Sequence, residues 1–252
     1  MHGAEEEIFY VLGGSGLSWQ DGKVYEIEEG DCLAHLPLAE THTLIAGPGG
    51  LDVLAYGTLI HTEFAILPRA GIYRFPPKSV EITADGRSPW ERDNAAGELE
   101  HGDPETERPE RIVNLRDITP QQWDQDEYLC VDRDLGRAAG SVKTGLVHLT
   151  VADGKLNCPP HCHSAEEELF VVLDGKGVCL LDDEEHPLRR GSVVGRPAGT
   201  GVAHAFRGPL TLLAYGTRDT NDVCYYPRTK KIHWRGLGVA ARIENLEPWE
   251  GV

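Results

Sequence analysis

The chain has 252 residues, of which 40% are hydrophobic, and this supports one large folded domain or two ordinary ones. Its formal net charge of −17, from 41 acidic and 24 basic residues, argues against binding to nucleic acid or to anionic membrane surfaces. The sequence contains no apolar run of about 18 residues and no basic, apolar leader, so we expect a cytoplasmic protein without a membrane span. Six cysteines without paired spacing favour reduced thiols over a disulfide framework.

The chain contains two copies of one sequence pattern. Residues 2–16, HGAEEEIFYVLGGSG, match residues 163–177, HSAEEELFVVLDGKG, at ten of fifteen positions with an offset of 161. The word LAYGT at 54–58 recurs at 213–217, where the offset is 159. Because the matched words are mixed in composition, chance similarity between low-complexity segments does not explain them. The sequence therefore predicts a duplicated domain.

Each copy consists of short runs rich in Val, Leu, Phe, Tyr and Thr. Turn words separate these runs, among them DGK at 153–155, DGKG at 174–177 and RRGS at 189–192. Turns that recur every roughly 8 to 12 residues, without a sustained helical period, are typical of an antiparallel sandwich or barrel. We predict an all-β fold with a first domain over residues 1–83 and a second over residues 112–252.

The residues between the copies, 84–111, are dense in charge, proline and glycine and poor in β-branched residues. Such a composition cannot bury enough apolar surface to order itself, so an acidic linker is predicted. The second domain is expected to begin near Ile112. Just inside it, TPQQWDQD at 119–126 predicts a short helical turn that Thr119 would cap.

The two copies differ in the length of chain that precedes the repeated pattern. About fifty residues separate the linker from His163, whereas one residue precedes His2. We therefore expect the first domain to lack its opening strands and a counterpart of His161. Either the sequence starts late, which we favour, or another segment or chain supplies those strands. In both cases an uncovered sheet edge is expected in the first domain.

The segment PPHCHSAEEELFVV, residues 159–172, carries a pattern of metal ligands. His161 and His163 are two residues apart, so on a strand their side chains lie on the same face. A tight turn would bring Glu168 back beside them, and His204 enters a later strand after a turn rich in Pro and Gly. Three imidazoles and a carboxylate suit Zn, Mn, Fe, Co or Ni. These four residues are therefore predicted to hold one divalent metal ion.

This arrangement resembles the two-part motif of the cupin family. The first part, from His161 to Gly175, has the spacing of the family, whereas Pro197 and His204 are two residues further apart than is usual. The resemblance is strongest to bacterial two-domain cupins (bicupins). It implies two tandem jelly-roll barrels (double-stranded β-helices), of which the first is truncated at its N-terminus, and a bound metal such as Fe, Mn, Zn or Ni. It also implies that a homodimer is common, although a bicupin that buries its sheets between its own halves would be a monomer.

In the first copy the corresponding positions are His2, Glu7 and His42, and without a first histidine we expect only a residual metal site there. In the second copy His148 is a candidate for the mouth of the site. Arg196 could receive a carboxylate, although a rim ion pair is the favoured interpretation. Alternation along the strands places three apolar side chains around the ion, namely Phe170, Val172 and Phe206. Four other histidines are interpreted as surface or core residues: His61, His101, His186 and His233.

The predicted function is a metal-dependent pocket for a small polar organic molecule. The fold does not fix the reaction, so three alternatives stand. The first is an Fe(II)-dependent dioxygenase, and the second is an isomerase, decarboxylase or lyase in which Zn, Mn or Ni polarises a carbonyl. The third is a module that binds a sugar or metabolite without catalysis. No general base stands out beyond the ligands, which slightly favours the dioxygenase and binding roles.

Overall fold

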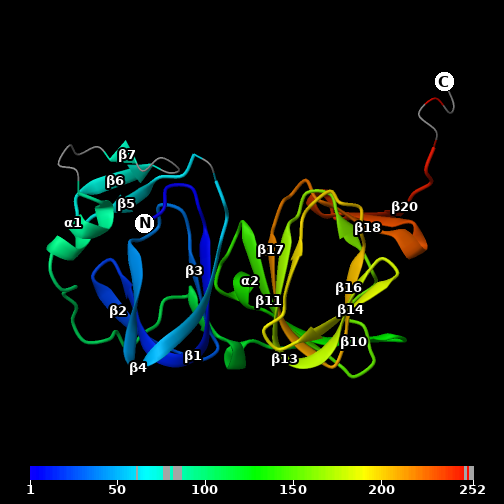
Figure 1. Ribbon diagram of the computed structural model, residues 1–252, viewed down its shortest axis with the longest axis horizontal. Coiled ribbons are helices and arrows are strands. Elements are labelled where there is room, and N and C mark those ends of the chain that lie inside the picture. The colour runs from blue at the N-terminus through cyan, green and yellow to red at the C-terminus, as the bar shows by residue number, and fades with distance from the viewer. Residues whose placement is uncertain (61, 76–79, 82–86, 247–248, 250–252) are drawn as a thin grey trace. The chain divides into compact units, whose positions relative to one another are not determined.

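The computed structural model describes residues 1–60, 62–75, 80–81, 87–246 and 249 (Figure 1). Its contacts divide the chain into two compact units, each formed by two stretches of sequence. The first unit comprises Met1–Ile118 and Leu135–Thr144, and the second comprises Thr119–Asp134 and Gly145–Val252. Strands make up 54% of the structure and helices 8%, which confirms the predicted all-β fold.

The first unit is built around β1 (Glu7–Gln20), the long central strand of a five-stranded antiparallel sheet. This strand pairs with β2 (Lys23–Glu28), β3 (Asp31–His35) and β4 (His42–Gly57), and β8 (Ile112–Asn114) adds to β3. Alternating side chains of these strands point to one face and enclose a core. Its buried members are Val11, Tyr25, Ile27, Leu33 and Ile112.

A small sheet and a helix lie between β4 and β8 along the chain. The helix α1 (Pro89–Ala95) begins at Ser88, whose side chain accepts a hydrogen bond from the backbone N–H of Glu91. The Glu91 carboxylate accepts one from the N–H of Ser88, so the helix starts with a capping box. The small antiparallel sheet consists of β5 (Ala65–Leu67), β6 (Ile72–Phe75) and β7 (Val80–Glu81).

The segment that composition marks as a linker, residues 84–111, contains α1 and also contacts the first sheet. The N–H of Glu105 donates to the carbonyl of Val24 at 2.9 Å, and Arg108 forms an ion pair with the fully buried Asp31. Ile112, the expected start of the second domain, lies in β8 of the first unit. The division in the structure thus differs from the sequence-based one because charged residues of this segment have buried partners.

A later stretch of chain, residues 135–144, belongs to the first unit and is held there by Glu6. It begins with α2 (Leu135–Ala138), whose Leu135 is fully buried. The Glu6 carboxylate is 1% exposed and accepts hydrogen bonds from the backbone N–H groups of residues 142–144. It also accepts hydrogen bonds from the hydroxyls of Ser141 and Thr144. This acceptor with five donors ties the segment to the start of β1.

In the second unit, β13 (Glu168–Leu181) is the central strand of an eight-stranded sheet (Figure 1). It pairs with β14 (Glu184–Arg189), β15 (Val193–Arg196), β16 (His204–Arg207) and β17 (Leu210–Thr217). Three strands extend the sheet beyond β17 in the order β11 (Thr144–Val151), β10 (Tyr128–Asp134) and β9 (Gln121–Gln125).

The helical turn predicted over residues 119–126 is wrong, because this segment contains β9. Trp123 pairs with Cys130 of β10, and its indole N–H donates to the carboxylate of Asp132 at 2.6 Å. Pairing with a neighbouring strand outweighs the local Thr-Pro signal for a helix start.

The units also differ at the strand that follows the repeated pattern. In the part of the chain that the structure describes, β4 pairs only with β1, whereas β17 pairs with both β13 and β11. The first unit therefore has no described strand in the position of β11.

A four-stranded antiparallel sheet completes the second unit. It consists of β12 (Cys162–His163), β18 (Val223–Tyr226), β19 (Lys231–Trp234) and β20 (Val239–Arg242). Short 3-10 helices occur at Leu115–Asp117 in the first unit and at Pro227–Thr229 and Arg235–Leu237 in the second. No helix among the described residues is long and apolar enough to cross a membrane.

The central strand bends at a glycine in both units. Gly14 has a φ of 80°, and a Cβ atom there would lie 2.3 Å from the carbonyl oxygen of Gly50. The corresponding Gly175 has a φ of 91°, and its Cβ atom would lie 2.3 Å from the carbonyl oxygen of Pro209. Because only glycine accepts this conformation and this contact, the repeated glycine is a structural requirement of the fold.

The core of the second unit lies within its large sheet and contains the three side chains that alternation places inside. Phe170, Val172 and Phe206 are each at most 3% exposed. Burial of each such side chain stabilises the fold by about 1.5–3 kcal/mol. The other buried members are Cys130, Val151, Cys179, Leu188, Leu210 and Leu212. All six cysteines of the chain are free, as predicted.

Candidate metal centre

Four short segments of the second unit bring the predicted ligands together. His163 lies in β12, Glu168 begins β13 and His204 begins β16. The backbones of His161 and His204 are hydrogen-bonded to each other in both directions, at 3.1 and 2.8 Å. This bridge places the two imidazole rings 4.7 Å apart between centroids, and the rings of His161 and His163 are 5.0 Å apart.

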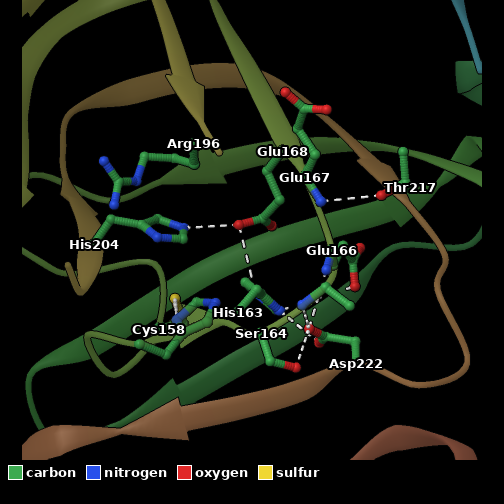
Figure 2. A network of polar contacts seen from close by, with 12 residues as sticks. Cys158, His163, Ser164, Glu166, Glu167, Glu168, Arg196, His204, Thr217 and Asp222 are labelled. Carbon is green, nitrogen blue, oxygen red and sulfur yellow. Dashed lines mark hydrogen bonds and ion pairs between the residues drawn. The ribbon is translucent and has the colours of Figure 1, made fainter. Parts of the chain in front are cut away.

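Glu168 lies at the centre of this group (Figure 2). Its Oε2 atom is 3.1 Å from Nε2 of His204 and 3.4 Å from Nε2 of His163. The ligand atoms of His161, Glu168 and His204 all lie within 4.8 Å of one another. Imidazole nitrogens and a carboxylate oxygen at these separations can share one ion after small side-chain adjustments.

Two atoms of the group are buried without a hydrogen-bond partner, namely Nε2 of His163 and Oε2 of Glu168. A buried polar atom that stays unsatisfied costs about 1–3 kcal/mol, so such atoms in a native structure need an explanation. A cation bound between them would satisfy both atoms at once. The residues present therefore fit a divalent metal ion.

The electrostatics of the group also suit metal ligands. Burial, reinforced by the neighbouring His204, lowers the pKa of His161 to about 4, so its imidazole is neutral at pH 7. Burial opposes the charge of Glu168, but the close contact with His204 and the other nearby imidazoles hold the pKa of its carboxyl below the usual range. A neutral imidazole and an ionised carboxylate are the protonation states in which these two side chains bind a metal.

Comparison with known proteins agrees with this architecture. Residues 147–214 match the model of the cupin domain family. Solved structures of cupin proteins share the fold of both units. The alignment with Bacillus subtilis oxalate decarboxylase covers 88% of this chain and 66% of that protein, with 16% identity and a TM-score of 0.53. The chain has the fold of a two-barrel cupin. Each unit is hereafter called a cupin barrel.

Two further solved structures are similar to parts of this chain. Tomato vicilin covers 94% of this chain and 75% of its own, with 15% identity and a TM-score of 0.53. A sugar phosphate isomerase of the cupin superfamily from Silicibacter pomeroyi covers 48% of this chain and 83% of its own, with 25% identity and a TM-score of 0.43. No curated protein matches the sequence. These similarities concern the fold and assign no reaction to the chain.

A small cavity lies beside three of the predicted ligands in the second cupin barrel. The cavity that touches His163, Glu168 and His204 has a volume of about 10 Å³, which is close to the space of one water molecule. Phe170 and Phe206 belong to the buried core of the same barrel, with their ring centroids 4.5 Å apart. The aromatic ring of Phe170 also lies 5.5 Å from that of His204.

The two other candidates in this barrel have different surroundings. Arg196 lines the small cavity and donates to the carbonyl of Val202 at 2.6 Å, so it holds the loop that leads to His204. His148 is 8% exposed and lies in β11, and it is not among the residues that line this cavity. Burial lowers the pKa of its imidazole.

Two groups that the sequence analysis did not identify also lie at the centre. The buried thiol of Cys224 lies close to His161 and His163, and these three side chains form a second candidate ligand group. Burial raises the pKa of Cys224 to about 11, so it is a neutral thiol at pH 7. Asp222 is fully buried and contacts Nδ1 of His163 at 2.7 Å. At the offset of 159, Asp222 aligns with Glu63, and this shared acidic residue is the sequence signal that could have marked the region.

The first cupin barrel repeats the central arrangement with fewer predicted ligands. Oε2 of Glu7 is 3.2 Å from Nε2 of His2 and 2.9 Å from Nε2 of His42. A third imidazole, that of His35, is stacked on His42 at 3.8 Å between ring centroids. Its Nδ1 is 2.7 Å from the Glu40 carboxylate, and its Nε2 is buried without a partner. The sequence analysis did not single out His35, because its strand position corresponds to Arg196 in the second barrel.

The first barrel also contains more room. A cavity of about 250 Å³ touches His2 and His42 and is walled by Trp19 and Trp90, with Arg74 at its lining. The remaining histidines lie elsewhere: His101 and His186 are exposed, as expected, whereas His233 is half-buried in β19. His61 lies outside the described residues.

Proposed function

We propose that the second cupin barrel binds one divalent metal ion through His161, His163, Glu168 and His204, and that this centre acts on or binds a small polar molecule. The observation that carries this proposal is the convergence of these side chains, with two buried ligand atoms that have no other partner. When bound, such an ion supplies Lewis acidity or, if it is redox active, electron-transfer chemistry. Fe, Mn, Zn and Ni all accept this ligand set.

The residues of the barrel limit the molecule that could reach the ion. The cavity of about 10 Å³ that touches His163, Glu168 and His204 has room for about one water molecule, which favours a small ligand over an extended one. A wider cavity of about 390 Å³ borders the outer side of this region at Cys162 and His163 and is lined by Tyr225 and Ile232. It supplies apolar surface next to one of the ligand residues.

The metal content of the purified protein tests the proposal. Protein prepared without a histidine tag should contain about one equivalent of a divalent metal by elemental analysis. The double variant His161→Ala with His163→Ala should contain less than about a tenth of that amount, because two of four ligands are gone. The exposed His101 and His186 provide a matched double alanine control, which should keep the full metal content. Equal metal content in all three proteins would rule out this centre.

The reaction is tested separately once the metal is known. Oxygen uptake with a panel of catechol, gentisate, thiol and keto-acid substrates would identify a dioxygenase. Isomerisation or decarboxylation of keto acids without oxygen uptake would identify Lewis-acid catalysis. Saturable binding from the same panel without turnover would identify a binding module. Each outcome must disappear in the double histidine variant to be assigned to this centre.

A further inference from the structure

Asp222 lies directly behind one of the proposed ligands. It is fully buried in the connection between β17 and β18, and its Oδ2 atom is 2.7 Å from Nδ1 of His163 (Figure 2). Its Oδ1 atom accepts hydrogen bonds from the backbone N–H groups of Ala165 and Glu166, at 3.0 and 3.1 Å, and from the hydroxyl of Ser164 at 3.4 Å. The carboxylate therefore joins the turn after β12 to the imidazole.

The division of donors between the two oxygens fixes their roles. Backbone N–H groups can only donate, so Oδ1 of Asp222 must be an acceptor. An ionised carboxylate has no proton to give, so Oδ2 accepts a hydrogen bond from Nδ1 of His163. The Nδ1–H tautomer leaves a lone pair on Nε2, which is the atom that faces Glu168 at 3.4 Å. A histidine ligand is oriented in this way when its other nitrogen donates to a carboxylate.

The first cupin barrel repeats this buried carboxylate at the offset of 159. Glu63 is 3% exposed and accepts hydrogen bonds from the N–H groups of Gly3, Ala4 and Glu5, at 2.7 to 2.8 Å. Its Oε1 atom is 3.4 Å from Nδ1 of His2, which is longer than the contact made by Asp222. Both copies thus place a buried acidic residue beside the turn that leads into three consecutive glutamates, residues 5–7 and 166–168. Asp222, which has the shorter side chain, makes a closer histidine contact than Glu63.

We propose that Asp222 is a positioning residue of the metal centre, which holds His163 in the tautomer whose Nε2 atom is free to bind the ion. This inference rests on the proposed function, because it assigns His163 as a ligand. It adds a carboxylate that does not itself touch the metal. It also separates the second barrel from the first, where the equivalent carboxylate mainly holds the turn.

The substitution Asp222→Asn tests the tautomer while preserving the turn. The two backbone donors keep the amide oxygen at the position of Oδ1, which turns the amide NH₂ toward His163. That group donates to Nδ1, so the proton of the imidazole moves to Nε2 and blocks the ligand lone pair. We expect the Zn²⁺ affinity, measured by chelator competition, to fall about 10- to 100-fold. The thermal midpoint of the metal-free protein should change by no more than a few degrees.

A readout that needs no metal accompanies the affinity. Long-range ¹H–¹⁵N correlation spectra of the metal-free protein should show His163 as the Nδ1–H tautomer in the wild type and as the Nε2–H tautomer in Asp222→Asn. The His163→Gln variant assigns the signal. Glu63→Gln, the matched change in the first barrel, should leave both the Zn²⁺ affinity and the His163 signal unchanged.

The outcomes separate the two proposals. Wild-type affinity and an unchanged Nδ1–H signal in Asp222→Asn would overturn the positioning role. Absence of Zn²⁺ binding in the wild type would overturn the proposed function, and the tautomer measurement would still decide whether Asp222 sets the imidazole. A large loss of thermal stability in Asp222→Asn together with an unchanged His163 tautomer would show that Asp222 only holds the turn, which also contradicts the inference.

Discussion

The two cupin barrels share one central arrangement but distribute ligands and space in opposite ways. In both, a glutamate oxygen lies between two imidazole nitrogens: Glu7 between His2 and His42, and Glu168 between His163 and His204. The second barrel adds a further predicted ligand and has a cavity of about 10 Å³ there, whereas the first has a cavity of about 250 Å³. Duplication has thus preserved the scaffold of the site while its contents have diverged.

The difference shows which parts of the motif are structural. The bend at Gly14 and Gly175 and the buried carboxylates of Glu63 and Asp222 occur in both barrels. These features shape the central strand and the turn before it, whatever the site holds. The side chains around the site differ more, since the first barrel has His35 where the second has Arg196. The repeated glycine and the repeated buried carboxylate therefore belong to the scaffold.

The largest expected effect is on metal affinity, and it separates the barrels. Glu168→Gln removes the only anionic ligand of the proposed set, so we expect the affinity for Zn²⁺ to fall by more than about 100-fold, since loss of an outer partner alone costs about 10- to 100-fold. Glu7→Gln is the matched change in the first barrel and should alter the affinity of the tightest Zn²⁺ site by less than about twofold. Titration calorimetry measures both. A greater loss from Glu7→Gln would place the stronger site in the first barrel.

The fold could be predicted from the sequence because both duplication and alternation can be recognised in short segments. The repeat from His2 to Gly16 identified the two central strands, and the period of two correctly placed Phe170 and Phe206 inside. The spacing of two residues did not by itself bring His161 and His163 together with Glu168. Their convergence depends on the backbone bridge between His161 and His204, which joins segments over forty residues apart in the sequence.

Other features could not be predicted because distant residues determine them. Asp222 reaches His163 from 59 positions away, and no local pattern marks it. Arg108, within the predicted linker, pairs with the buried Asp31, which composition alone cannot show.

A smaller effect is expected on stability, and it falls on the first barrel. Glu6 and Glu167 occupy equivalent positions of the repeat, but Glu6 is buried with five donors and Glu167 is exposed. Glu6→Gln replaces one acceptor oxygen by an NH₂ group that faces backbone N–H donors, which should lower the free energy of unfolding by about 2–3 kcal/mol. Glu167→Gln should change it by less than about 0.5 kcal/mol. Calorimetric scans of both variants against the wild type measure the difference, and equal shifts would contradict the anchoring role of Glu6.

The smallest expected effect concerns Cys224, which distinguishes two ligand sets for the same barrel. Its thiol lies near His161 and His163, but burial raises its pKa to about 11, and the first barrel has Ala65 at the equivalent position. If the ion is held by the three imidazoles and Glu168, Cys224→Ala removes no ligand and should change the Zn²⁺ affinity by less than about threefold. A thiolate ligand would instead be lost, with a fall of more than about 100-fold. Replacement of Zn²⁺ by Co²⁺ gives an independent measure, because a sulfur-to-cobalt charge-transfer band in the near ultraviolet would appear in the wild type and vanish in the variant only if Cys224 binds the ion.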